Sequence, residues 1–214
     1  MTTATNSDDI LPDHGASGAS EAPTRKRPKP GERRLQILQT LAGMLEQPGA
    51  ERITTAALSA KLGVSEAALY RHFASKAQMF EGLIDFVEQS VFAFVRQIAD
   101  REPAGPAQVA RTVALILQFA EKNPGMARVM TGDALVFENE RLQERMNLLF
   151  ATRESAFKQS LRDGGAPSET PTVDAQVAAS LLVAFMMGRM QRFARSGFKR
   201  LPSENLQASL ARIL

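Results

Sequence analysis

Apolar side chains recur along most of this chain at intervals of three and four residues. The first such run contains Leu35, Leu38, Leu41, Ala42 and Leu45. This spacing gathers side chains on one face of an α-helix, which makes a turn about every 3.6 residues. The alternating pattern of a β-strand is scarce, and residues that favour helices dominate the composition. The pattern therefore predicts an all-α protein.

Turn and capping residues divide this pattern into successive helices. Pro48-Gly49 and the pair Pro103 and Pro106 interrupt it. Thr54 or Thr55, Ser65 and Ser75 can each cap a helix start, and Gln78 has the spacing of a capping box with Ser75. The predicted helices cover 31–47, 54–61, 65–73, 75–100, 107–122, 124–135, 138–163, 172–196 and 203–213.

Charge is unevenly distributed along the chain. All 26 Lys and Arg residues lie beyond residue 24, whereas four of the 23 acidic residues precede it. A basic folded portion suits a polyanionic partner. Residues 1–30 contain few large apolar groups, so we expect a disordered tail. Its basic end, Arg25–Pro30, is either a solvated linker or an arm that binds DNA phosphate or a minor groove.

Several classes of protein are disfavoured by composition. The chain has no Cys and only two histidines, His14 and His72, so it offers no disulfide, thiolate site or histidine metal cluster. Acidic residues at 133, 138, 140 and 144 are interpreted as a solvated helix face. We assign no catalytic residue, metal ligand or cofactor and expect a protein that is not an enzyme. Without a secretory signal or a membrane-spanning run, it is expected in the cytoplasm, with no membrane partner.

Residues 53–73 have the pattern of a helix-turn-helix. Gly63 can take the positive φ of a tight turn, and Val64 can fill the core between two helices. In the helix that follows, Leu69 and Phe73 are four residues apart and face inward together. The same geometry turns Ala67, Tyr70 and Arg71 outward and leaves His72 at the border.

The outward face has side chains suited to DNA. Small Ala67 and Ala68 allow the helix to approach a major groove and contact a thymine methyl group. Arg71 can reach base edges or phosphate, and the Tyr70 hydroxyl can donate to phosphate. Thr54 and Lys76 stand at helix starts, where phosphate is favoured. The alternative interpretation is a plain helical hairpin with a solvated charged face.

These residues resemble the N-terminal domain of TetR-family regulators over about residues 33–90. The resemblance is carried by Thr54, Leu58, Gly63-Val64-Ser65, Leu69-Tyr70, His72-Phe73 and Ser75-Lys76. It implies an all-α homodimer that binds palindromic double-stranded DNA through two recognition helices. The expected DNA-binding residues are Thr54, Thr55, Ser65, Glu66, Ala67, Ala68, Tyr70, Arg71, His72 and Lys76.

The resemblance also implies a division of the chain. We expect a tail at 1–30, a helix-turn-helix DNA-binding domain at 31–76, and a helical dimerisation and partner-binding domain at 77–214, joined by the long fourth helix. Residues 172–196 and 203–213 resemble the helix pair that forms the dimer interface of the family. The apolar side chains of 172–196, among them Ala175, Leu182, Met186 and Met190, suit that interface or an ordinary core equally well.

Longer stretches resemble the nucleoid occlusion branch of the family. They are Arg52–Ala56, Val64–Phe73, Glu121–Gly125, Met130–Leu135 and Arg141–Asn147. The resemblance implies a nucleoid-associated protein that binds chromosomal palindromes and then blocks assembly of the division tubulin FtsZ. Its partner groove lies between the fourth and fifth helices, where Phe86, Leu115, Lys122 and Asn123 match. The chain departs from that pattern at 1–30, at 101–107 and at Gln118.

Two interpretations of the fourth helix stay open. Its apolar stripe includes Phe80, Ile84, Val87 and Val91, with Phe86 at its edge and Phe92 nearly opposite. The helix is either packed on several sides as a connector, or one phenylalanine borders a partner groove.

A second functional hypothesis is a ligand-responsive transcriptional repressor. It requires a closed and mostly apolar pocket of a few hundred Å³ with polar anchors. A solid C-terminal core would favour the division inhibitor, for which we expect no small-molecule ligand.

Overall fold

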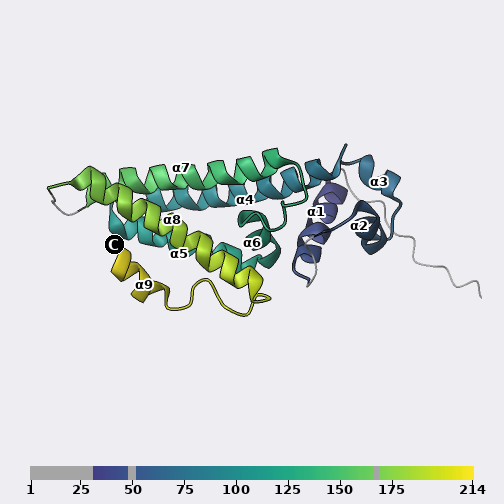
Figure 1. The fold of residues 1–214 in the computed structure, drawn as a ribbon. Coiled ribbons are helices and arrows are strands. Elements are labelled where there is room, and N and C mark those ends of the chain that lie inside the picture. The colour runs from purple at the N-terminus through teal and green to yellow at the C-terminus, as the bar shows by residue number, and fades with distance from the viewer. Residues whose placement is uncertain (1–30, 48–51, 166–168) are drawn as a thin grey trace, which may run out of the picture.

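The computed structural model describes residues 31–47, 52–165 and 169–214, which form nine α-helices and no strand (Figure 1). The predicted all-α class is confirmed. The helices are α1 Glu32–Leu45, α2 Thr55–Leu62, α3 Glu66–Tyr70, α4 Lys76–Ala99, α5 Pro106–Lys122, α6 Pro124–Met130, α7 Glu140–Gly164, α8 Pro171–Arg195 and α9 Leu206–Ile213. The expected tail at 1–30 and the helix stop at Pro48-Gly49 lie outside the described residues.

The helix bounds differ from the predicted ones mainly at three ends, and the helix predicted at 65–73 already ends at Tyr70. The helix predicted at 124–135 ends at Met130, because Gly132 takes the left-handed conformation (φ 83°) that closes a helix. The last helix begins at Leu206 rather than near 203. Boundary residues are the least determined part of a helical pattern.

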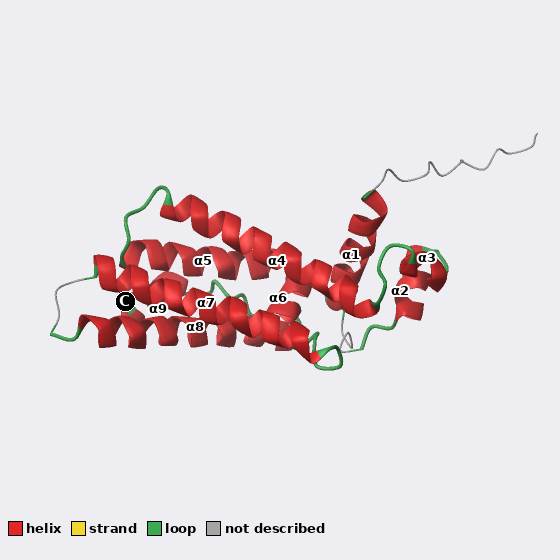
Figure 2. Ribbon diagram, turned by 90° about the horizontal axis from the view of Figure 1, so that it is seen from above, coloured by secondary structure: helices red, strands yellow, loops and turns green. Residues whose placement is uncertain are grey.

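The molecule is elongated, with α1, α2 and α3 gathered at one end (Figures 1 and 2). We call these three helices the head and α4 to α9 the body. The long α4 begins beside the head and runs along the body, where α7 and α8 pack against each other. One continuous set of buried apolar side chains extends from α1 to α9. The head is therefore packed onto the body rather than merely tethered to it.

Helix α1 uses a different apolar stripe from the one that the spacing suggested. Its buried residues are Ile37, Leu41 and Leu45, each four positions apart. Leu35, which we expected on the packed face, is 56% exposed. Leu35 lies two positions before Ile37, and two positions correspond to a rotation of about 200° around the helix axis. Its side chain therefore faces the opposite side. Leu35 is therefore free to border a groove.

A glycine sets the distance between α1 and α6. A Cβ atom built on Gly125 would lie 2.2 Å from the carbonyl oxygen of Ala42 and 3.3 Å from the Cβ of Leu45. Only a residue without a side chain lets the first turn of α6 approach the α1 backbone this closely. The head therefore contacts the body where two helix backbones approach closely. A close-packed interior cannot easily shift to make room for an added side chain there.

Helix α4 packs on several sides, as expected of a connector. Phe80, Ile84, Val87 and Val91 are buried. Phe92 is exposed, and its ring lies 5.0 Å from the guanidinium carbon of the buried Arg153 on α7. Burial lowers the pKa of Arg153, whose Nε has no hydrogen-bond partner among the described residues. Phe92 therefore covers a buried cation, whereas Phe86 stays available for another role.

The apolar residues of α8 were equally compatible with an ordinary core and with a dimer interface. Ala175, Leu182, Met186 and Met190 are buried within the monomer, so the core interpretation holds for them. A second stripe is exposed and consists of Val173, Val177 and Leu181. These three residues are four positions apart and lie on one face. The helix is therefore apolar on two sides, and one of them lacks a partner within the described monomer.

The composition of α8 also corrects one expectation. The helix is long and apolar enough to cross a membrane, with a mean hydropathy of 1.3 over an 18-residue window. The expectation that no segment reaches this threshold is wrong by that measure. In the fold, however, one face of α8 packs along α7 and contacts α5 and α6. Its apolar character thus has a structural use inside the helical body.

The close contact at Gly125 can be tested by adding one methyl group. Gly125→Ala should destabilise the protein by about 1–3 kcal/mol, because the new Cβ overlaps the α1 backbone. Gly43→Ala in α1 is the matched control, since a Cβ there meets nothing within 4 Å. The control should be neutral or stabilising by up to about 1 kcal/mol. Thermal unfolding of both variants makes the comparison, and equal stability of the two would contradict the close approach.

Candidate nucleic-acid interface

The starts of α2 and α3 are fixed by the predicted hydroxyl caps. The Thr54 hydroxyl accepts a hydrogen bond from the Ala57 amide at 3.1 Å, and the Ser65 hydroxyl accepts one from Ala68 at 3.3 Å. Both capping residues have the extended backbone that an N-cap requires. Thr54 is therefore the cap of α2, and Thr55 is its first helical residue.

Gly63 makes the turn between these helices. Its backbone is left-handed, with φ 65°, and the amides of Gly63 and Val64 donate to carbonyl groups at the end of α2. This is the conformation that favours glycine after a helix. The predicted turn at Gly63-Val64 is confirmed, and it brings α3 back across α2.

The two faces of α3 differ as the spacing indicated. Leu69 and Phe73 are fully buried. Ala67, Tyr70 and Arg71 are exposed, whereas Ala68 and His72 are half-buried. Helix α3 ends at Tyr70, and Arg71 is its C-cap residue. The outward side chains thus share one surface, and their contact with DNA stays a prediction.

Two of the predicted DNA-binding residues contact each other. The Thr55 hydroxyl donates to a carboxylate oxygen of Glu66 at 2.6 Å. This bond joins the first turn of α2 to the first turn of α3, across the turn at Gly63. We had assigned both residues to DNA, and the structure gives them an additional role in holding the two helices together. Their eleven-residue separation offers no periodic signal from which the pair could be predicted.

Lys76 has a protein partner that the sequence did not reveal. Its ammonium group pairs with the carboxylate of Glu138, which lies just before α7 and is 9% exposed. The ammonium also lies 5.7 Å from the centre of the Phe80 ring. Lys76 is thus held at the start of α4. A phosphate there would share the ammonium group with Glu138 or compete with it. We expected this position at a phosphate, but not its partner on the body.

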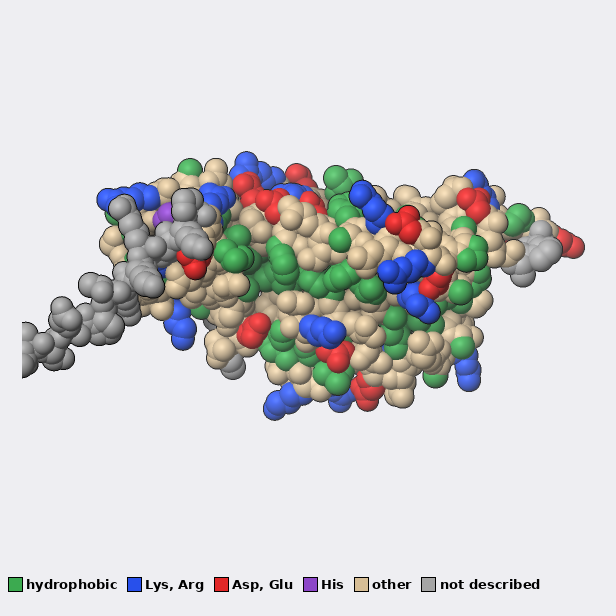
Figure 3. Space-filling model, turned by 180° about the vertical axis from the view of Figure 1, so that it is seen from behind, with side chains coloured by type: hydrophobic (Ala, Val, Ile, Leu, Met, Phe, Trp, Pro, Cys, Tyr) green, Lys and Arg blue, Asp and Glu red, His purple; other side chains and the backbone are tan. Residues whose placement is uncertain are grey.

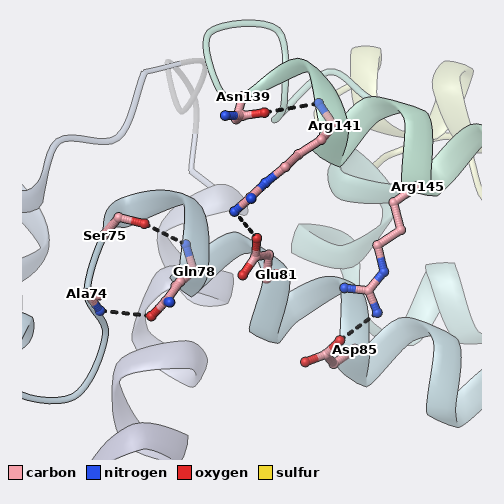
Figure 4. Close-up of polar contacts among 8 residues, drawn as sticks. All are labelled: Ala74, Ser75, Gln78, Glu81, Asp85, Asn139, Arg141 and Arg145. Atoms are coloured by element: carbon pink, nitrogen blue, oxygen red, sulfur yellow. Dashed lines mark hydrogen bonds and ion pairs between the residues drawn. The ribbon is translucent and has the colours of Figure 1, made fainter.

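A ladder of further polar contacts joins α4 to α7, and Figure 4 shows part of it. Only half of the predicted capping box forms: Ser75 accepts from the Gln78 amide, but the Gln78 side chain accepts from the Ala74 amide rather than from that of Ser75. Arg141 pairs with Glu81. Arg145 contacts Asp85 and Glu88, and the hydrogen bond to Glu88 is the main factor that raises the pKa of its guanidinium.

The predicted partner residues lie near a groove between the head and the body. A cavity of about 330 Å³ is lined by Leu35, Leu38 and Ala42 of α1, by Leu83 and Phe86 of α4, and by Asn123 and Met126, among others. Phe86 is half exposed, and its ring centre lies 5.9 Å from that of Phe119. The partner groove was expected between α4 and α5, whereas this cavity also has a wall formed by α1; its role as a partner groove stays a prediction. The exposed Leu35 is the side chain that could have indicated this wall.

The other two predicted partner residues extend from this cavity along α5. Lys122 is exposed and Leu115 is half-buried, but neither lines the cavity. The Asn123 side chain donates to the carbonyl of Phe119 at 2.8 Å and thereby fixes its orientation. A band of hydrophobic side chains runs along the body on the side turned away in Figure 1 (Figure 3).

A larger cavity bears on the ligand-responsive alternative. Its volume is about 620 Å³, and it lies between α6, residues 133–137 and the end of α8. By volume it meets the criterion for a ligand pocket. However, it is open to solvent, and its lining includes Arg128, Arg195, Glu46 and Asp133. The closed and mostly apolar pocket that the repressor hypothesis requires is not this cavity.

Comparison with protein families matches both parts of the chain. Residues 37–83 match the family described as bacterial regulatory proteins, tetR family. Residues 103–213 match the tetracyclin repressor-like C-terminal domain of the SlmA-like type. The two matches cover the head with the first part of α4, and then α5 to α9.

Individual relatives extend this match over nearly the whole folded chain. A protein of Idiomarina loihiensis named nucleoid occlusion factor SlmA is 51% identical over 177 residues, which is 82% of this chain and 90% of the relative. The SlmA protein of Vibrio cholerae is 48% identical over 175 residues, or 81% and 89% of the two chains.

Solved structures give the same fold at lower identity. The TetR-family regulator PfmR of Thermus thermophilus has a TM-score of 0.62 at 20% identity, over 84% of this chain and 97% of that one. AibR, solved with isovaleryl coenzyme A and operator DNA, has a TM-score of 0.63 at 16% identity, over 85% and 97%. At this identity the likeness concerns the fold alone.

Arg71 provides the first test of the outward face. Arg71→Ala should weaken binding to a duplex that the unmodified protein selects from random sequence, because an exposed cation is lost from the recognition surface. If Arg71 contacts phosphate, the dependence of log affinity on log salt should decrease by about one unit. If it contacts a base edge, preference at one position should relax instead. Unchanged affinity in titrations over a range of salt concentrations would remove Arg71 from the contact set.

Proposed function

Because the chain belongs to the TetR family of bacterial regulators, among its nucleoid occlusion factors, we propose that it binds palindromic chromosomal sites as a homodimer and blocks FtsZ assembly while bound. One observation carries this proposal. Identity of about half extends over head and body together in relatives named for nucleoid occlusion. A shared head alone would support only DNA binding.

DNA binding is assigned to the exposed face of α3 and the start of α2. Arg71 and Tyr70 are both exposed there, and Ala67 leaves room for the helix in a major groove. Thr54 is exposed at the start of α2, and a helix start favours phosphate. The protein would then act in the cytoplasm on the nucleoid as a regulator rather than an enzyme.

The exposed stripe of α8 supports a homodimer. Val173, Val177 and Leu181 form an unpartnered apolar face on a helix whose other face is packed in the monomer. A second copy would cover the same stripe with its own, as an isologous two-fold interface requires. Two heads related by such an axis match the symmetry of a palindrome. The proposed dimer and the proposed palindrome binding therefore rest on the same two-fold symmetry.

The partner groove is assigned to the surface between α1, α4 and α5. Phe86 and Asn123 border a mostly apolar cavity, and Lys122 adds an exposed cation beside it. An extended FtsZ segment with apolar and acidic side chains would suit this surface. One wall is α1, which belongs to the head, so any movement of the head on DNA would change the shape of the groove. This shared wall supports a DNA-dependent activity.

The decisive experiment is sedimentation of FtsZ polymer with the protein, in the presence and absence of its selected duplex. We expect polymer to decrease only when protein and duplex are both present. Replacing Lys122 and Asn123 with Ala should restore polymer while leaving duplex binding intact. Lys199→Ala, which removes an exposed cation outside the groove, is the control and should behave as the unmodified protein. Full inhibition by the double variant would reject the groove, and inhibition without DNA would reject the DNA dependence.

The dimer interface can be tested by placing a charge on the stripe. Leu181→Glu should shift the protein toward monomer in sedimentation velocity, because a carboxylate cannot be buried there without a partner. Affinity for the palindromic duplex should fall with it. Val136→Glu alters an even more exposed apolar residue elsewhere and should leave the dimer unchanged. A dimeric Leu181→Glu variant would place the interface on another surface.

A further inference from the structure

The recognition helix α3 is too short to hold its own orientation. It contains five residues, Glu66–Tyr70, and little more than one helical turn. Helices of this length gain their stability from the contacts around them rather than from their own hydrogen bonds. Its orientation relative to the rest of the head must therefore be set by neighbouring side chains.

The start of α3 is fixed by groups close in sequence. The Ser65 hydroxyl caps it, and Thr55 donates to Glu66 across the turn. Both contacts come from the helix-turn-helix itself. They hold one end of α3 and leave its far end, after Tyr70, to be fixed by something else.

Arg34 of α1 holds that far end. Its guanidinium donates a hydrogen bond to the backbone carbonyl of His72, and its central carbon lies 4.1 Å from the centre of the Phe73 ring. The amides of His72 and Phe73 both donate to the carbonyl of Leu69 and close the helix. One side chain, 38 positions before His72 in the sequence, thus contacts both residues that follow the C-cap of the recognition helix. A charge-assisted bond and a cation–π contact together are stronger than either alone.

We propose that Arg34 is a positioning residue for DNA recognition, which fixes the far end of α3 so that Arg71 meets base edges in register. The inference rests on the proposed DNA-binding function. Base-edge hydrogen bonds require accurate distances and angles, whereas phosphate attraction tolerates small displacements. Releasing this end of α3 therefore reduces sequence-specific binding more than non-specific binding.

Arg33 provides the matched control within the same turn of α1. It has the same charge, but its guanidinium donates to Gln36 of its own helix at 2.7 Å. Arg33→Gln and Arg34→Gln each remove one positive charge from adjacent positions. Only Arg34→Gln removes a contact between α1 and the segment that follows α3. Any difference between the two variants thus reports the positioning contact rather than charge.

The experiment measures the dissociation constants of both variants for the selected duplex and for a scrambled duplex of equal length, over a range of salt. Non-specific affinity and its salt dependence should be the same for the two variants. Arg34→Gln should lose about tenfold more specific affinity than Arg33→Gln, which equals about 1.4 kcal/mol. Arg34→Lys should recover part of that loss, because an ammonium can still donate to the His72 carbonyl. Amide exchange should accelerate at His72 and Phe73 but not at Leu58 of α2, which excludes general unfolding of the head.

Three results would overturn the inference. Equal behaviour of Arg33→Gln and Arg34→Gln on both duplexes would remove any special role for Arg34. A loss of the same size on both duplexes, with a salt dependence lower by about one unit than for Arg33→Gln, would make Arg34 a phosphate contact instead. If the unmodified protein fails to distinguish selected from scrambled duplex, the proposed function falls and the inference with it. The first two results leave the proposed function intact.

Discussion

The packing of α1 against two neighbours at once is the constraint on which the rest of the structure depends. Its buried stripe of Ile37, Leu41 and Leu45 anchors the head, and its backbone at Ala42 meets Gly125 of α6 in the body. The same helix reaches the end of the recognition helix through Arg34 and forms one wall of the groove beside Phe86. Because one helix makes all of these contacts, we expect a displacement of the recognition surface to be transmitted to the groove.

A second set of contacts lies within the body, starting beside the head, and is polar rather than apolar. The pair of Lys76 with Glu138 begins a ladder of ion pairs that continues through Glu81 with Arg141 to Arg145. Exposed ion pairs contribute little to stability, so their main effect here is on geometry. They hold the first turns of α4 in register with α7. A phosphate that attracts Lys76 would act directly on this ladder, at the point where it meets the head.

Most of the fold could be predicted from spacing and capping residues, because a helix that buries one face has apolar residues at regular intervals in its sequence. The Gly63 turn, the caps at Thr54 and Ser65, and the inward Leu69 and Phe73 were all predictable in this way. What escaped prediction depends on contacts between distant residues: Arg34 with His72, Lys76 with Glu138, and the approach of Gly125 to α1. The exposed stripe of α8 was missed for a related reason, since apolar residues on two faces do not reveal which face the monomer buries.

The central claim is that DNA binding and inhibition of division are one activity of one folded unit. Imaging of division rings in cells that lack their own nucleoid occlusion factor tests it most directly. With the unmodified protein, rings should be excluded from the nucleoid. With Arg71→Ala at the same cellular level, rings should form over it, because the protein no longer occupies the chromosome. Exclusion that persists when the protein is released from DNA would contradict the account.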